Sequence, residues 1–357
     1  MSAMSGPTAD SFYDLPTETQ IERVRGLARR ALPEWGIDSS VELPLVAERE
    51  NVVFRIDGPP AAGFAVRVHR AGYHSDAQLW SQIVWARALS ADGVIHTAEV
   101  VDTTAGAAFA IAEAAGVPEP RQVTLLRWVP GTPLADLGGG DAAVLEQLGV
   151  LMATLHDHAS RWEPPAGFDV LRWDVDGLVG DAPEWGRFWE CADLDPDERS
   201  DLVAFRDRAR AELREWGEAP DRFSLVHGDF LPENLLIDRD ETVTLLDFDD
   251  CGFGWHLFDI ATALAMPSLR RDFPELRDAF VGGYRTRRAL PDEHLARLPL
   301  FLALRAATYA GWMHTRAHTA FAQAVGPMVI DAAVATVRDY LATPPAGQDR
   351  GRSPVGS

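Results

Sequence analysis

The first part of the chain alternates between helical and strand-like hydrophobic patterns. Residues 15–36 carry apolar side chains near helical spacing until Pro33, which predicts a helix that this proline interrupts. Three short β-rich runs follow at residues 41–46, 51–56 and 64–69, and a turn-forming Asp-Gly-Pro-Pro segment separates the last two. The last two runs therefore predict an antiparallel hairpin.

Side chains within the third run alternate in character. Phe64, Val66 and Val68 fall on one face of the strand, whereas Arg67 and His69 fall on the other. We expect the apolar face to pack in a core and the other face to line a cleft. A helix opening at Ser75 follows, and then more strands at residues 98–103, 107–113 and 123–129 before a proline–glycine break.

Beyond residue 140 the periodicity is mainly helical. Helices are expected at residues 142–158, 196–216, 259–265, 275–287, 295–318 and 327–341. Asp195, Pro196 and Glu198 carry the signature of a capping box at the start of the second of these helices. The pattern predicts an α+β protein, with a small β-rich lobe followed by a larger, mainly helical one.

These patterns divide the chain into four parts. We expect an N-terminal helical extension at 1–40, an N-lobe at 41–130, a C-lobe at 131–342 and a disordered tail at 343–357.

Composition narrows the class of protein. A hydrophobic content of 46% can supply a core, and a net charge of -21, from 54 acidic and 33 basic residues, disfavours nucleic acid and anionic lipid as partners. The two cysteines are too few for a disulfide framework. The N-terminus lacks signal-peptide features, and the apolar run at 299–313 is too short for a membrane span and is broken by Arg305. A cytoplasmic protein is the simplest assignment, and its oligomeric state stays open.

Polar residues capable of chemistry cluster in residues 224–250. His227, Asp229 and Asn234 lie between apolar runs, and Asp247 and Asp249 follow the second run. Asp229 and Asn234 are five residues apart, the spacing of a base and a metal-binding amide in kinase catalytic loops. Each residue alone is more often structural, but their joint order favours phosphoryl transfer over a metal-dependent hydrolase.

The stretch closely resembles the aminoglycoside phosphotransferase-like kinases, a superfamily that includes antibiotic kinases, choline kinase, type II homoserine kinase and a stress-response serine/threonine kinase. The resemblance rests on two motifs, which read His227-Gly228-Asp229-x-x-Pro232-x-Asn234-Leu235-Leu236 and Leu246-Asp247-Phe248-Asp249-Asp250. It extends over most of residues 41–340, and it implies a protein-kinase-like two-lobed fold with ATP between the lobes.

The resemblance also implies roles for these residues. Asp229 would act as general base, His227 would shape the loop, and Asn234 and Asp247 would bind magnesium, with Asp249 assisting or only solvating the metal. Asp259 resembles a position that braces the catalytic loop, although an ordinary helix N-cap would look the same.

The same resemblance places a nucleotide site in the N-lobe. Arg67 stands where a phosphate-binding lysine is usual, and Gln82 where a glutamate usually pairs with it, so the site departs from the family pattern. Asn51 would help to cover the phosphates in the absence of a glycine-rich loop. An adenine pocket would be lined by Val52, Leu126 and Trp128.

These features predict an enzyme that transfers phosphate from ATP, with magnesium, to a hydroxyl of a small metabolite, amino alcohol or aminoglycoside-type antibiotic. Two alternatives stay open: a protein serine/threonine kinase of the stress-response type, and a nucleotide-binding module without activity, motivated by Gln82. Arg305 and Trp185 are weak candidates for the acceptor side, and a packing or surface role is favoured for both. Nothing in the sequence names the acceptor.

Overall fold

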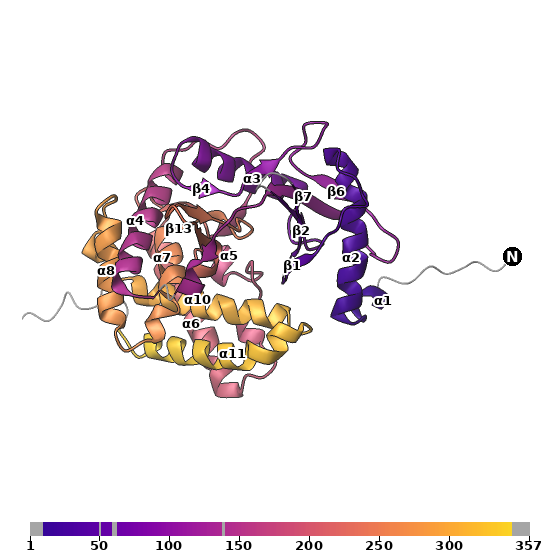
Figure 1. Ribbon diagram of the computed structural model, residues 1–357. Helices are drawn as coiled ribbons and strands as arrows, with labels where there is room; N and C mark the ends of the chain where they lie inside the picture. The colour runs from indigo at the N-terminus through magenta and orange to yellow at the C-terminus, as the bar shows by residue number, and fades with distance from the viewer. Residues whose placement is uncertain (1–9, 50, 59–62, 138–139, 345–357) are drawn as a thin grey trace, which may run out of the picture. The chain divides into compact units, whose positions relative to one another are not determined.

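The computed structural model describes residues 10–49, 51–58, 63–137 and 140–344 (Figure 1). The expected tail from residue 345 onward lies outside these residues. The chain forms two compact units, each built from separate segments. Unit 1 consists of Met1–Thr132, Pro164–Asp169 and Leu236–Leu246, and unit 2 of Pro133–Glu163, Val170–Leu235 and Asp247–Ser357.

Unit 1 is built on an antiparallel sheet with the strand order β1-β2-β3-β7-β5, and β6 also pairs with β7. The strands are β1 (Leu45–Glu48), β2 (Val52–Ile56), β3 (Phe64–Val68), β5 (Val100–Val101), β6 (Ala110–Ala112) and β7 (Arg121–Arg127). The predicted hairpin is confirmed, because β2 pairs with β3 in a register that sets Val53 opposite Arg67. Its turn at residues 59–62 lies outside the described residues.

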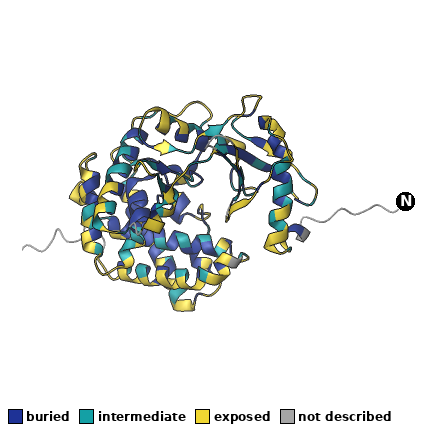
Figure 2. Cartoon of the chain, viewed as in Figure 1, coloured by how far each residue is buried: buried dark blue, intermediate teal, exposed yellow. Residues whose placement is uncertain are grey.

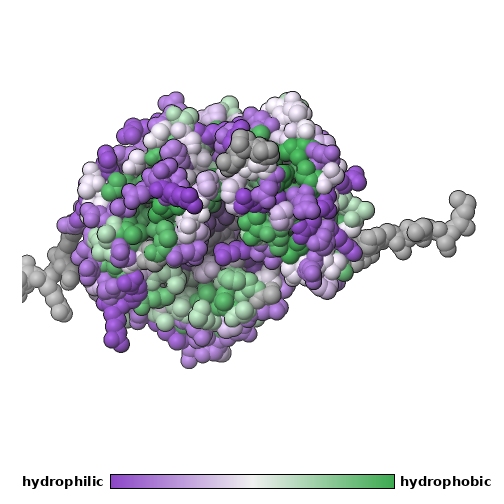
Figure 3. Space-filling view, in the orientation of Figure 1, coloured by the Kyte–Doolittle hydropathy of each residue, from purple (hydrophilic) through white to green (hydrophobic). Residues whose placement is uncertain are grey.

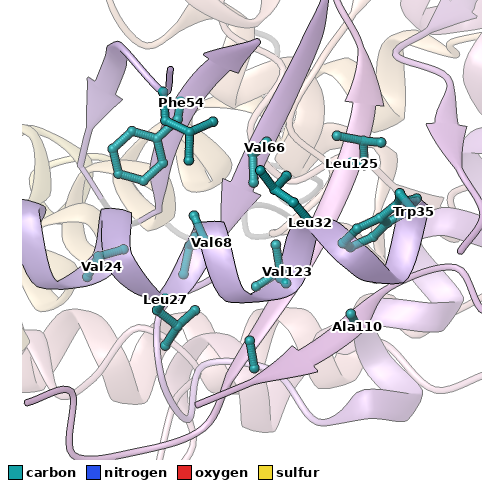
Figure 4. Packing of buried hydrophobic residues seen from close by; sticks show 14 of the residues in the cluster. Val24, Leu27, Leu32, Trp35, Phe54, Val66, Val68, Ala110, Val123 and Leu125 are labelled. Atoms are coloured by element: carbon teal, nitrogen blue, oxygen red, sulfur yellow. The ribbon is translucent and has the colours of Figure 1, made fainter. Parts of the chain in front are cut away.

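Helix α2 (Thr17–Ala31) packs on this sheet. Val24, Leu27 and the adjoining Leu32 share one hydrophobic cluster with Val66 and Val68 of β3, and Figure 4 shows these side chains gathered between helix and strands. The apolar face of the third run therefore packs as predicted. Pro33 ends the α-helix, and the chain continues as the 3-10 helix η1 (Leu32–Trp35). A short helix, α1 (Asp10–Tyr13), precedes α2.

Helix α3 (Asp76–Ala91) starts as predicted at Ser75. The Ser75 hydroxyl accepts a hydrogen bond from the backbone of Gln78, whose side chain returns one to the backbone of Ser75, so a complete capping box fixes this end. A second sheet has the order β4-β12-β11-β8, formed by β4 (His96–Thr97), β8 (Thr132–Pro133), β11 (Leu235–Ile237) and β12 (Val243–Leu245).

Unit 2 surrounds a small sheet with the order β10-β13-β9. Its strands are β9 (Leu171–Trp173), β10 (Phe223–Val226) and β13 (Gly252–Trp255), and its longer helices are α4 (Ala142–Ala159), α6 (Pro196–Trp216), α7 (His256–Leu264), α8 (Phe273–Arg285), α10 (Leu298–Thr315) and α11 (Ala320–Leu341). Shorter elements are η2 (Leu134–Leu137), α5 (Val175–Val179), η3 (Phe188–Glu190), η4 (Pro232–Asn234), η5 (Pro267–Leu269) and α9 (Asp292–Leu295). The predicted capping box of Asp195 and Glu198 opens α6.

Two helix predictions need correction. The helix expected at 295–318 is shorter in the structure, because α10 begins at Leu298 and ends at Thr315, and Leu295 ends the separate helix α9. Pro299 lies in the first turn of α10, where its missing N–H is tolerated. Helix α11 begins before Pro327, which lies inside it instead of at its start.

Burial follows the amphipathic patterns. Figure 2 shows buried residues on the inner sides of the helices and exposed residues on their outer sides, and hydrophilic residues cover most of the face drawn in Figure 3. Cys191 and Cys251 are free and buried, and burial raises the pKa of both thiols, to about 12 for Cys191. No helix among the described residues is long and apolar enough to span a membrane.

Candidate active site

The candidate catalytic loop, residues 227–234, follows strand β10 directly. Its sharp turn depends on Gly228, which has a φ of 78°. A Cβ atom at this position would lie 2.2 Å from the carbonyl oxygen of Asp250, which also accepts a 2.7 Å hydrogen bond from the Trp173 indole. Only glycine fits here, because both the backbone conformation and the close carbonyl exclude a side chain.

Asp259 anchors the start of this loop. It lies in the first turn of α7 and is fully buried, and its carboxylate accepts hydrogen bonds from the backbone amides of His227 (2.8 Å) and Gly228 (2.7 Å). The bracing interpretation therefore holds, and the N-cap alternative is wrong because Trp255 is the N-cap of α7. Burial alone would raise the pKa of Asp259, but hydrogen bonds from His156 and the loop hold that pKa below its ordinary value.

Both carboxylate oxygens of Asp229 are held by side chains. Arg305 Nη2 donates to Oδ1 at 3.0 Å, and Asn234 Nδ2 donates to Oδ2 at 2.9 Å. The side chain nevertheless keeps 23% of its surface exposed, so a small molecule can reach it. Burial, reinforced by the charge of Asp247, raises the pKa of Asp229 against the opposing effect of Arg305.

His227 lies wholly inside the protein. Its Nδ1 accepts a 3.3 Å hydrogen bond from the backbone amide of Asp229, and its ring contacts Phe248 at a centroid distance of 4.9 Å. These contacts fit a residue that shapes the loop.

The three expected metal ligands, Asn234, Asp247 and Asp249, all follow Asp229 in the sequence. Asn234 ends η4, and its amide nitrogen donates hydrogen bonds to Asp229. Its amide oxygen is therefore the side-chain atom that would bind a metal. Asp247 is half-buried, with a φ of 61°, whereas Asp249 is buried. Among the described residues, no three or more His, Cys, Asp or Glu side chains gather to hold a metal.

The expected nucleotide residues all belong to unit 1. Arg67 lies on β3 opposite Val53 and Thr124, and Gln82 lies on the buried side of α3 with 4% of its surface exposed. The side-chain carbonyl of Asn51 accepts a 3.1 Å hydrogen bond from the backbone amide of Arg70, which ties the start of β2 to the end of β3.

The three expected adenine-lining residues are half-buried. Val52 begins β2, Leu126 lies on β7 opposite Ala65, and Trp128 follows β7 with its ring under the guanidinium of Arg55 at 4.3 Å.

Sequence reasoning undervalued Arg305 and Trp185. Arg305 pairs with Asp229 across 76 positions of the chain, and Trp185 stacks on the Arg305 guanidinium at 4.7 Å. The only sequence signal for this pair was Arg305 itself, the single charged residue in the apolar run at 299–313. An arginine buried in such a run needs an acidic partner.

The profile of the phosphotransferase enzyme family matches residues 42–298, and the chain belongs to this family. It is 31% identical to a microcompartment-associated aminopropanol kinase of known structure, with a TM-score of 0.80, covering 89% of this chain and 97% of that one. It is also 29% identical, over 71% of each chain, to an uncharacterised protein of Deinococcus radiodurans.

The fold alone is shared with an amicoumacin kinase, hAmiN, solved with AMP-PNP, Ca²⁺ and Ami, at 20% identity and a TM-score of 0.68. That alignment covers 91% of this chain and 95% of the other. The comparisons confirm the predicted superfamily and the protein-kinase-like α+β fold. The protein is a phosphotransferase, and the solved structures that it resembles include kinases of small molecules.

Proposed function

We propose that this protein transfers the γ-phosphate of ATP to a hydroxyl group of a small molecule, with Asp229 as the general base. The observation that carries the proposal is the double anchoring of the Asp229 carboxylate by Arg305 and Asn234. Phosphoryl transfer requires little of the protein beyond positioning and charge stabilisation, and a carboxylate held at both oxygens is already positioned.

In this reaction the acceptor hydroxyl gives its proton to Asp229 while its oxygen bonds to the γ-phosphorus. The bond between that phosphorus and the bridging oxygen of ADP breaks, and ADP leaves with the electron pair. The raised pKa of Asp229 suits a base that must hold the proton briefly.

Magnesium is the metal that the donor atoms suit. Asn234, Asp247 and Asp249 offer hard oxygen ligands, and a site with few protein ligands fits Mg²⁺, which keeps waters and binds phosphate oxygens. When bound, the ion would neutralise negative charge on the phosphates.

The nucleotide would be held mainly by unit 1. Arg67 would donate to phosphate oxygens, with Gln82 and Asn51 supporting it. Val52, Leu126 and Trp128 offer half-buried apolar surface of the kind that an adenine ring covers. The two free, buried thiols fit a reducing compartment, and we infer that the enzyme works in the cytoplasm.

Amino alcohols are the first acceptors to test, because an aminopropanol kinase is 31% identical to this chain. The test measures ADP release with MgATP over a panel of amino alcohols, sugars and aminoglycosides, and identifies phosphorylated products by mass. A generic protein substrate and autophosphorylation are included in the same assay. We expect one small-molecule class to be phosphorylated.

Asp229→Asn tests the base. Because it removes the proton-accepting charge, we expect transfer to fall by about 100-fold or more, while ATP binding, measured by calorimetry, stays near that of the wild type. Asp278→Asn, an exposed aspartate on α8, is the control. Transfer that persists in Asp229→Asn would rule out this base, and transfer only to protein would favour a protein kinase.

A further inference from the structure

Arg305 is a buried arginine whose only charged hydrogen-bond partner among the described residues is Asp229. It lies in the middle of α10 with 5% of its surface exposed, and its Nη2 donates to Asp229 Oδ1 at 3.0 Å. Its Nη1 is buried and meets no hydrogen-bond acceptor in the described part of the chain. The protein thus buries a full positive charge whose charged hydrogen-bond partner is the Asp229 carboxylate.

The guanidinium is fixed from a second side by aromatic rings. Its central carbon lies 4.7 Å from the ring centroid of Trp185 and 5.5 Å from that of Tyr309. Trp185 is itself held, because its indole N–H donates to Asp250 Oδ1 at 3.2 Å. Stacking and hydrogen bonding together leave Arg305 little freedom to move away from Asp229.

Another arginine in unit 2 shows what a purely structural arrangement looks like. Arg208 also stacks on an aromatic ring, Tyr340, at 4.4 Å and pairs with a carboxylate, Glu212, at 2.8 Å. Its guanidinium in addition donates to the backbone carbonyl of Thr343 at 2.8 Å. Arg208 therefore joins α6 to the C-terminal end of α11, whereas the charged hydrogen-bond partner of Arg305 is the proposed base.

We propose that Arg305 is a positioning residue that holds the Asp229 carboxylate in its reactive orientation, with Trp185 as its platform. Asn234 anchors Oδ2 and Arg305 anchors Oδ1, so the two contacts together stop the carboxylate from rotating. Without Arg305 the carboxylate would keep only the Asn234 contact and would turn away from the acceptor hydroxyl. This inference rests on the proposed role of Asp229 as base.

The test uses the full-length enzyme and an acceptor that the wild type phosphorylates. In Arg305→Met we expect kcat to fall by about 10- to 100-fold, because a displacement of the base by about 1 Å is enough for such a loss. The KM for ATP is expected to stay within about twofold of the wild-type value. Arg208→Met is the matched control, and we expect it to lower the melting temperature and leave kcat unchanged.

A double-mutant cycle separates positioning from general damage. If Arg305 acts through Asp229, adding Arg305→Met to Asp229→Asn will cause no further loss of kcat, because the group to be positioned is already gone. The proposal would be wrong if the kcat losses of the two single variants multiplied in the double variant. It would also be wrong if Arg305→Met changed only KM.

Two further measurements keep the test decisive if Arg305→Met folds poorly. Arg305→Lys keeps the charge but lacks the planar fork, so its kcat should lie between those of wild type and Arg305→Met. Guanidinium ion added at millimolar concentration should restore part of the kcat of Arg305→Ala, and it should not affect Asp229→Asn. Absence of rescue combined with a wild-type kcat in Arg305→Lys would contradict the proposal.

The outcomes also separate this inference from the proposed function. A wild-type enzyme that phosphorylates no acceptor would refute the proposed function, whereas an active wild type with an unaffected Arg305→Met variant would refute the positioning role alone.

Discussion

At the scale of single residues, Asp247 has a backbone conformation that residues other than glycine rarely adopt. Its φ of 61° is in the left-handed region, where a non-glycine residue costs roughly 1–3 kcal/mol. A carboxylate kept there against this cost fits a residue retained for its charge. Asparagine tolerates the same conformation, which makes it the cleanest replacement.

Asp247→Asn should therefore fold normally and bind nucleotide poorly when magnesium is present. Because the replacement removes the charge that would attract the cation, we expect MgATP affinity to fall by about 10-fold or more, with ATP affinity in EDTA unchanged. Titration calorimetry with and without MgCl₂ measures both. An unchanged magnesium dependence would count against the ligand role of Asp247.

The sequence identified site residues that lie close together in the motif, but it did not identify the residues from other parts of the chain that contact them. Asp229 and Asn234 were recognisable from order and spacing, and the structure joins Asn234 to Asp229. The family resemblance suggested the bracing role of Asp259, which the structure joins to the loop. Arg305 comes from a helix 76 positions away, and its spacing on α10 carries no mark of its partner.

At the scale of elements, α4 and α8 approach each other through glycines. A Cβ at Gly149 would lie 2.0 Å from the carbonyl oxygen of Phe280, and a Cβ at Gly283 would lie 1.9 Å from that of Glu146. Figure 1 shows the two helices running side by side. This close contact brings together His156 of α4 and Tyr284 of α8, whose side chains are 2.9 Å apart.

Gly283→Ala should force the two helices apart. We expect it to lower the free energy of unfolding by roughly 1–3 kcal/mol, as other overpacked contacts do, measured by urea denaturation. Gly282→Ala is the matched control on the same helix, because a Cβ there meets no atom within 4 Å. That variant should gain about 0.5–1 kcal/mol from the helix propensity of alanine. Equal effects of the two substitutions would contradict the backbone contact.

Element prediction succeeded where local side chains decide the outcome. Capping boxes at Ser75 and Asp195 start α3 and α6 where the sequence indicated, because the capping hydrogen bonds join residues three apart. Prolines were less informative, since Pro299 lies in the first turn of α10 instead of inside a helix that starts at residue 295, and Pro327 lies inside α11 instead of at its start.

At the scale of the whole molecule, a buried polar network connects the candidate catalytic loop to three helices of unit 2. His156 hydrogen-bonds to Asp259 at 3.1 Å, stacks on His256 at 4.4 Å and meets Tyr284. His256 in turn bonds to Ser224 on β10 at 2.8 Å. Burial lowers the pKa of both histidines. For His156 the hydrogen bond that it donates to Asp259 opposes this effect, and for His256 the charge of His156 adds to it.

This network predicts that stability declines in mild acid. Because the folded-state pKa values of His156 and His256 are lowered, the unfolded chain takes up protons on these rings first as the pH falls below about 6.5. The free energy of unfolding should fall by about 1.4 kcal/mol per pH unit for each ring, until the folded-state pKa values are reached. Urea denaturation between pH 7.5 and 5 measures the slope.

His256→Gln removes one of the two titrating rings. It should therefore reduce the slope of unfolding free energy against pH by about 1.4 kcal/mol per pH unit, whatever its effect on stability at neutral pH. His318→Gln, at an exposed position in the same unit, is the control and should leave the slope unchanged. If His256→Gln keeps the full wild-type slope, this ring does not titrate as proposed. Asp259 does not contribute to the slope between pH 7.5 and 5. Because its pKa is lowered in the folded protein, the stabilisation that its carboxylate provides is lost only at more acidic pH.

The sequence by itself determined the α+β class, the hairpin of β2 and β3, and the loop that carries Asp229 and Asn234. These features depend on spacings of two to five residues, which hydrophobic alternation, capping and motif order record directly. Only the tertiary structure decided which side chains hold that loop and its carboxylate. Arg305 contacts this carboxylate, and His156 contacts the aspartate that braces the loop, both from distant helices. Trp185 holds Arg305 from the turn between α5 and η3. Because burial and packing select such partners, no local sequence pattern predicts them.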